Sequence, residues 1–146
     1  MRALLVLPLI LLAGACGSMT AAPPTSRAPS GGGEGPPPAW IQTKAGSIWL
    51  GLSSYCWTQK WKGTCADAVA PQCGEPGVPD VRVQRGETVR AHLGYSATEA
   101  SVGQASAPAE LHGRTVSWRF AQAGAFVLFT KRGSSDASYV GCATIR

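Results

Sequence analysis

The chain has 146 residues, of which 13 are Lys or Arg and 8 are Asp or Glu, giving a formal net charge of +5. A chain of this length has room for one folded domain with a single hydrophobic core. The basic residues are scattered and form no concentrated stripe, so the composition argues against a nucleic-acid partner.

Residues 1–15 have the pattern of a signal peptide. A positive start and an apolar run too short to span a membrane precede small residues at Ala13-Gly14-Ala15. The stretch ending at Cys16 resembles the lipobox of bacterial lipoproteins, except that Ala13 stands where the usual pattern has a large aliphatic residue. The resemblance implies that Cys16 carries a lipid and anchors the chain to the extracytoplasmic face of the cell membrane. The alternative is an ordinary signal peptide, cleaved near Ala15 to release a secreted protein.

Residues 16–39 form a linker that is rich in proline and glycine. This segment has almost no large apolar side chain, and such sequences bury too little surface to offset the entropy lost on ordering. We therefore expect a disordered, lipid-anchored stalk with a stretched reach of about 75 Å.

The remaining residues, 40–146, predict an all-β domain. Apolar and polar residues alternate in short runs, no run carries a helical stripe over three turns, and Gly and Pro recur throughout. A turn or excursion is expected at 58–64 and a loop at 71–79, whereas 97–113 shows no clear period and is compatible with a crossing between sheets. In chain order, the expected strands are 46–57, the pair 81–83 and 89–93 joined at a Gly turn, 116–120, and a closing hairpin of 125–130 with 139–145.

About seven short strands in a domain of this length fit an immunoglobulin-like antiparallel β-sandwich. Antibody domains have a tyrosine two residues before a strand cysteine, whereas Tyr139 stands three residues before Cys142. An odd spacing sends the two side chains to opposite faces of a strand, so the antibody arrangement of these residues does not transfer.

Four cysteines follow Cys16 in the sequence, and an even number in an exported domain predicts two disulfides. Four cysteines allow three pairings, which the sequence leaves open. We favour Cys56 with Cys65, closing a short loop, and Cys73 with Cys142, tying the middle of the chain to its last strand. The cysteines lack the Cys-x-x-Cys spacing of zinc and redox sites, so we expect no metal and no cofactor.

Several short motifs resemble a family of uncharacterised bacterial lipoproteins. They are Tyr55-Cys56-Trp57, a second cysteine at Cys65, and the late segment Asp136-Ala137-Ser138-Tyr139. The resemblance implies a sandwich fold without enzymatic activity, and it supports the pairing of Cys56 with Cys65. The presence of Cys73 and Cys142 departs from the family pattern.

Trp57, Lys60, Trp61 and Lys62 are the candidate binding residues. A loop closed by a disulfide that presents aromatic and cationic side chains is typical of a recognition surface. The alternative is structural, because five tryptophans in one small domain must mostly be buried. We expect Trp61 to be exposed and Trp57 to pack on the disulfide; buried positions are expected for Trp49 and Trp118.

No motif of an enzyme nucleophile, a metalloprotease or a phosphate-binding loop occurs, and His92 and His112 stand apart in the sequence. These observations predict a protein that is not an enzyme. The expected function is that of a membrane-anchored binding module at the cell envelope, with an envelope polymer or a protein as partner. A structural or accessory envelope protein and a secreted enzyme inhibitor are the alternatives.

Overall fold

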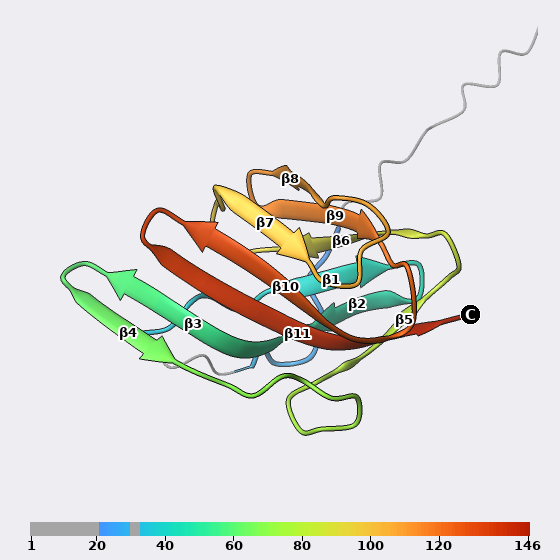
Figure 1. Cartoon of the computed structure of the whole chain (residues 1–146), viewed down its shortest axis with the longest axis horizontal. Helices are drawn as coiled ribbons and strands as arrows, with labels where there is room; N and C mark the ends of the chain where they lie inside the picture. The colour runs from blue at the N-terminus through green and yellow to red at the C-terminus, as the bar shows by residue number, and fades with distance from the viewer. Residues whose placement is uncertain (1–20, 30–32) are drawn as a thin grey trace, which may run out of the picture.

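The structure is a computed structural model that describes residues 21–29 and 33–146. Its described residues form an all-β sandwich of two facing sheets (Figure 1). None of them belongs to a helix long and apolar enough to cross a membrane. The strands are β1 (Trp40–Thr43), β2 (Gly46–Trp49), β3 (Gly51–Gln59), β4 (Lys62–Ala66), β5 (Asp80–Val83), β6 (Thr88–His92), β7 (Glu99–Val102), β8 (Glu110–His112), β9 (Thr115–Arg119), β10 (Gly124–Arg132) and β11 (Ser135–Ile145).

The sandwich has more strands than the sequence predicted, because several expected strands and loops divide between the two sheets. The five-stranded sheet has the order β2-β1-β6-β9-β8, and the six-stranded sheet has the order β4-β3-β11-β10-β7 with β5 beside β11. All neighbouring strands are antiparallel except β5 and β11, which run parallel. The expected antiparallel sandwich is therefore correct in class but wrong in strand number and in this one pairing; the immunoglobulin-like topology stays a prediction.

The expected strand 46–57 is two strands, because the chain changes sheets at Leu50. β2 pairs with β1 in one sheet, whereas β3 pairs with β4 and β11 in the other. At the crossing, the backbone N–H of Leu50 donates to the carbonyl of Ala39 at 2.9 Å, and the Leu50 side chain enters the core. Residues 97–113, which show no clear period in the sequence, cross between the sheets, because β7 joins the six-stranded sheet and β8 joins the five-stranded one.

The core lies between the sheets and follows the alternation of apolar residues. Ile41, Val89, Val116 and Leu128 are fully buried, each on a different strand. Period-two alternation puts these side chains on one face of each strand and leaves the polar positions outside.

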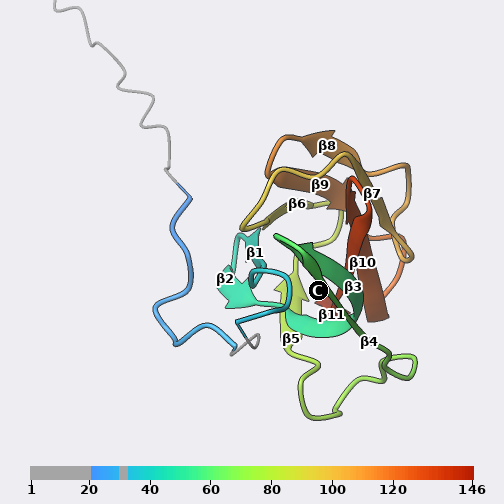
Figure 2. The same ribbon diagram turned by 90° about the vertical axis from the view of Figure 1, so that its left-hand side faces the viewer.

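The predicted disordered linker is wrong for residues 33–39, which pack against the sandwich. Pro36 is fully buried, and the hydroxyl of Tyr139 donates to the carbonyl of Pro37 at 2.7 Å. A side chain at Gly94 would lie 2.4 Å from Pro37, so the backbone fits closely at this contact. Residues 33–39 are ordered because Tyr139, far along the chain, hydrogen-bonds their backbone. Amino-acid composition alone does not predict such a contact. Residues 21–29 run past the β1–β2 edge (Figure 2).

The predicted signal peptide, residues 1–15, and the predicted lipid attachment at Cys16 lie outside the described residues.

Candidate functional site

The candidate site is the hairpin of β3 and β4, which projects beyond the rest of the sandwich (Figure 1). Gln59 pairs with Lys62, so Lys60 and Trp61 alone form the turn. Lys60 has φ of 53°, the left-handed conformation that tight two-residue hairpin turns need. The expected excursion at 58–64 is thus mostly regular strand with a two-residue tip.

A disulfide cross-links the two strands of this hairpin. Cys56 and Cys65 lie directly opposite each other in register, with 4.1 Å between their Cα atoms. The second disulfide joins Cys73 to Cys142, so both bridges have the pairing that we favoured. In the hairpin, the cross-link restricts shear between β3 and β4 and so holds the tip in place.

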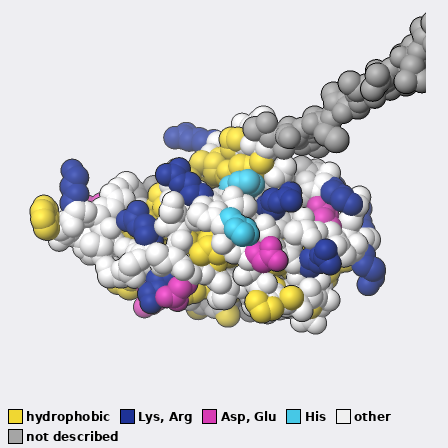
Figure 3. All heavy atoms as spheres, turned by 90° about the horizontal axis from the view of Figure 1, so that it is seen from above, with side chains coloured by type: hydrophobic (Ala, Val, Ile, Leu, Met, Phe, Trp, Pro, Cys, Tyr) yellow, Lys and Arg dark blue, Asp and Glu magenta, His cyan; other side chains and the backbone are white. Residues whose placement is uncertain are grey.

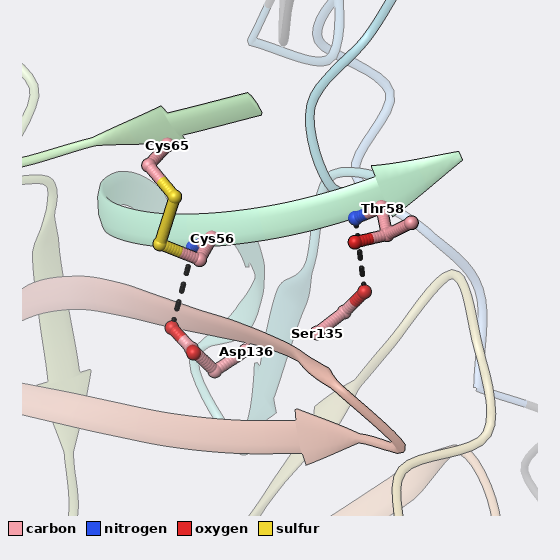
Figure 4. The surroundings of a disulfide bond; sticks show 5 residues. All are labelled: Cys56, Thr58, Cys65, Ser135 and Asp136. Atoms are coloured by element: carbon pink, nitrogen blue, oxygen red, sulfur yellow. Dashed lines mark hydrogen bonds between the residues drawn. A yellow bond between two sulfur atoms is a disulfide. The ribbon is translucent and has the colours of Figure 1, made fainter. Parts of the chain in front are cut away.

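The base of the hairpin is fixed to β11 by side chains (Figure 4). Asp136 Oδ1 accepts a hydrogen bond from the backbone N–H of Cys56 at 3.3 Å, and Ser135 Oγ accepts one from Thr58 at 2.9 Å. Backbone pairing of β3 with β11 ends at Cys56, so these side chains extend the attachment toward the tip. Among the described residues, the hairpin beyond Thr58 is held by its own pairing and by contacts of Gln59 and Lys62 with the linker.

The tip presents Trp61 to solvent between two lysines. Trp61 is 99% exposed, and Lys60 and Lys62 are also exposed. Lys62 Nζ lies 2.6 Å from Glu34 Oε1, an exposed ion pair that connects the hairpin to the linker. The structure therefore brings three of the four predicted binding residues together on one protrusion.

Trp57 is the exception, and its predicted place on the disulfide is wrong. It is 1% exposed, its ring lies 4.7 Å from that of Tyr95 in an edge-on arrangement, and the Arg132 guanidinium lies 4.4 Å above it. Cys56 faces outward, so the next residue along the strand must face the core. Trp57 supports the hairpin from inside the sandwich and cannot touch a ligand.

The other tryptophans divide between core and surface. Trp118 is buried as predicted, whereas Trp49 is only half-buried and its Nε1 donates to the carbonyl of Ser26 at 2.9 Å. Trp40 is half-buried and stacks on His92, with ring centroids 3.9 Å apart and planes 14° apart. Two tryptophans thus lie on the outer surface of the five-stranded sheet.

The two histidines come closer in the fold than in the sequence. His92 and His112 each pair in register with Thr115, from opposite sides of β9. Burial, followed by the nearby Arg90 charge, lowers the pKa of His92 below its ordinary value. Its Nε2 is buried and has no hydrogen-bond partner among the described residues.

The same sheet has a shallow depression that is lined in part by Thr88, Glu110, Ser117 and Arg119, and its lining includes no histidine. Within residues 21–29 and 33–146, no three His, Cys, Asp or Glu side chains gather where they could hold a metal ion.

Sequence reasoning missed the outer surface of the five-stranded sheet. The signal was present as alternating polar and aromatic positions in 40–43, 88–92 and 115–119, which face away from the buried residues between them. What the sequence could not supply was the order β1-β6-β9, which places these positions side by side.

Comparison with known proteins gives no match, whether to protein-family models, to curated proteins or to solved structures.

Proposed function

We propose that this protein is an exported lipoprotein, anchored through Cys16 at the extracytoplasmic face of the cell membrane, that binds an envelope polymer without catalysis. The tip of the β3–β4 hairpin is its contact surface. One observation carries the proposal, the 99% exposure of Trp61 at the end of a disulfide-linked hairpin.

A fully exposed tryptophan contributes little to folding, and its exposure is unusual, because this side chain is highly buried in most proteins. On a cross-linked hairpin its position is largely set before binding, so contact loses little conformational entropy. The indole supplies a flat apolar face with a polar N–H. The ammonium group of Lys60 beside it favours a polymer that carries negative charge, whereas that of Lys62 is paired with Glu34.

The export and anchoring parts of the proposal rest on the sequence of residues 1–16 and on the resemblance to bacterial lipoproteins. The two disulfides support them, because such bridges persist mainly in oxidising compartments.

The test is isothermal titration calorimetry of residues 17–146 with purified wall polymers and glycans, because its signal does not depend on Trp61. This segment retains residues 33–39, which belong to the packed domain. Trp61→Ala is the test variant, and Val69→Ala, at another exposed apolar side chain, is the matched control.

We expect saturable binding that is lost in Trp61→Ala and kept in Val69→Ala. Equal binding by both variants would remove the hairpin tip from the proposal. No response to any polymer would leave a protein partner, as for an accessory envelope protein or an enzyme inhibitor, as the remaining function.

A further inference from the structure

The outer face of the five-stranded sheet carries aromatic and basic side chains in register. One row across the strands runs from Trp49 through Trp40 and His92 to His112. The next row contains Arg90 and, two strands away, Glu110. The buried residues between these positions face the core, so both rows face outward.

The chain enters the domain on this same face. Ser47 Oγ donates to the carbonyl of Ala22 at 2.9 Å, and Trp49 Nε1 donates to the carbonyl of Ser26. Ser47 and Trp49 both lie on β2, at the edge of the five-stranded sheet. Only five residue steps separate Ala21 from Cys16, and they span at most about 17 Å when fully extended.

A lipid at Cys16 would therefore hold this edge of the domain next to the bilayer. The expectation of a long stalk assumed that all of residues 16–39 was free, whereas residues 22–26 and 33–39 contact the sandwich. The usable tether would then be short, and a lipid on Cys16 would keep the domain at the membrane surface.

The charges on this face are mostly positive. Glu110 is the only exposed carboxylate on the outer faces of the five strands, while Glu87 is buried and accepts hydrogen bonds from the backbone N–H groups of Lys44 and Gln84. On the six-stranded sheet the charges are mixed: Lys62 and Lys131 have acidic partners and Asp80 and Asp136 lie on its strands, whereas Arg82 and Arg132 have no ion-pair partner among the described residues. Figure 3 shows part of the face, where the two histidines (cyan) lie beside hydrophobic side chains and among Lys and Arg (dark blue), with Asp or Glu (magenta) also next to them. The basic residues on its strands, at its turns and on the adjoining linker are Arg27, Lys44, Arg90, Arg114 and Arg119.

We propose that the outer face of the five-stranded sheet docks on the anionic phospholipid surface of the membrane that holds the lipid anchor. This inference rests on the proposed lipidation of Cys16 for the position of the domain. Positive charge on the face complements anionic headgroups. Half-buried Trp40 and Trp49 match the interfacial preference of tryptophan. The six-stranded sheet then faces away from the bilayer.

The experiment measures co-sedimentation of unlipidated residues 17–146 with phosphatidylglycerol–phosphatidylcholine vesicles and with pure phosphatidylcholine vesicles. Without the anchor, binding depends on the face alone. The test variant is Lys44→Gln/Arg90→Gln/Arg114→Gln. The matched control is Lys60→Gln/Lys62→Gln/Arg82→Gln, which removes the same charge from the hairpin tip and from β5. Circular dichroism checks that both variants are folded.

We expect binding to the mixed vesicles only, weakened by about a hundredfold in the test variant, since each basic residue near an anionic surface contributes roughly fivefold. The control should lose less than about threefold, because its charges lie beyond the screening length from the bilayer. Equal losses in both variants, or no binding of the wild-type chain, would overturn the docking face. Loss in the control alone would assign the membrane contact to the hairpin. None of these results depends on polymer binding by Trp61. The membrane-docking proposal and the polymer-binding proposal can therefore fail independently of each other.

Discussion

The two disulfides close chain segments of very different length, and this difference predicts unequal effects on stability. Cys56 and Cys65 are 9 residues apart, whereas Cys73 and Cys142 are 69 apart. In the loop-entropy treatment, the short bridge stabilises the fold by about 2.7 kcal/mol and the long one by about 4.4 kcal/mol. The double variants Cys56→Ala/Cys65→Ala and Cys73→Ala/Cys142→Ala should therefore differ by about 1.7 kcal/mol in free energy of unfolding.

The packing around each bridge also favours a larger contribution to stability from the long bridge than from the short one. Cys56 and Cys65 are exposed, and the antiparallel backbone pairing of β3 with β4 still connects the two strands when the bridge is removed. Cys142 is only 7% exposed, and its bond to Cys73 holds a loop against the outer side of the six-stranded sheet. Loss of the long bridge therefore loosens this loop in the folded state and also raises the conformational entropy of the unfolded chain.

The assay is urea unfolding followed by tryptophan fluorescence, with the slope and midpoint fitted for each variant. With a slope of about 1.5 kcal/mol per molar urea, the two midpoints should lie about 1 M apart, and the long-bridge variant should unfold first. Equal midpoints at equal slopes, or the reverse order, would refute the reasoning that loop length dominates these two contributions.

Three further predictions concern single side chains. Trp57→Ala should lower the free energy of unfolding by about 3–5 kcal/mol because it empties the core, whereas Trp61→Ala should change it by less than about 0.5 kcal/mol; chemical denaturation measures both. Gly51→Ala should cost about 3 kcal/mol, because a Cβ there would lie 1.8 Å from the carbonyl oxygen of Gly77, and the thermal midpoint reports it. The lowered pKa of His92 means that the unfolded chain binds a proton more readily than the folded one below pH of about 6.5, so stability should fall as pH drops through this value.

Each of these predictions has its own control. Gly103→Ala has open space for a Cβ and should leave the thermal midpoint unchanged or slightly raised; a loss like that of Gly51→Ala would show that the clash with Gly77 is not the cause. His92→Gln removes the titrating group and should flatten the pH dependence near 6.5, and an unaltered slope would assign it to another residue. Similar losses for Trp57→Ala and Trp61→Ala would contradict the burial of the first.

Local geometry explains what the sequence predicted well. Period-two alternation identifies strands such as 116–120 and the hairpin of 125–130 with 139–145, because the pleat acts residue by residue. The same rule puts Tyr139 in the core and Cys142 on the opposite face of β11, where it reaches Cys73. It also sends Trp57 inward once Cys56 is known to face out, an inference that was within reach of the sequence.

The sequence by itself determined the fold class, and it favoured the disulfide pairing and the exposure of Trp61 that the structure then showed. Tertiary structure alone decided which sheet each strand joins, as at Leu50, and that residues 33–39 are part of the domain. The hydrogen bond from Tyr139 to Pro37 spans 102 residues, and no local pattern encodes such a contact. Alternation is a property of neighbouring residues. Sheet order and the packing of residues 33–39 depend instead on surfaces that form only when distant parts of the chain come together.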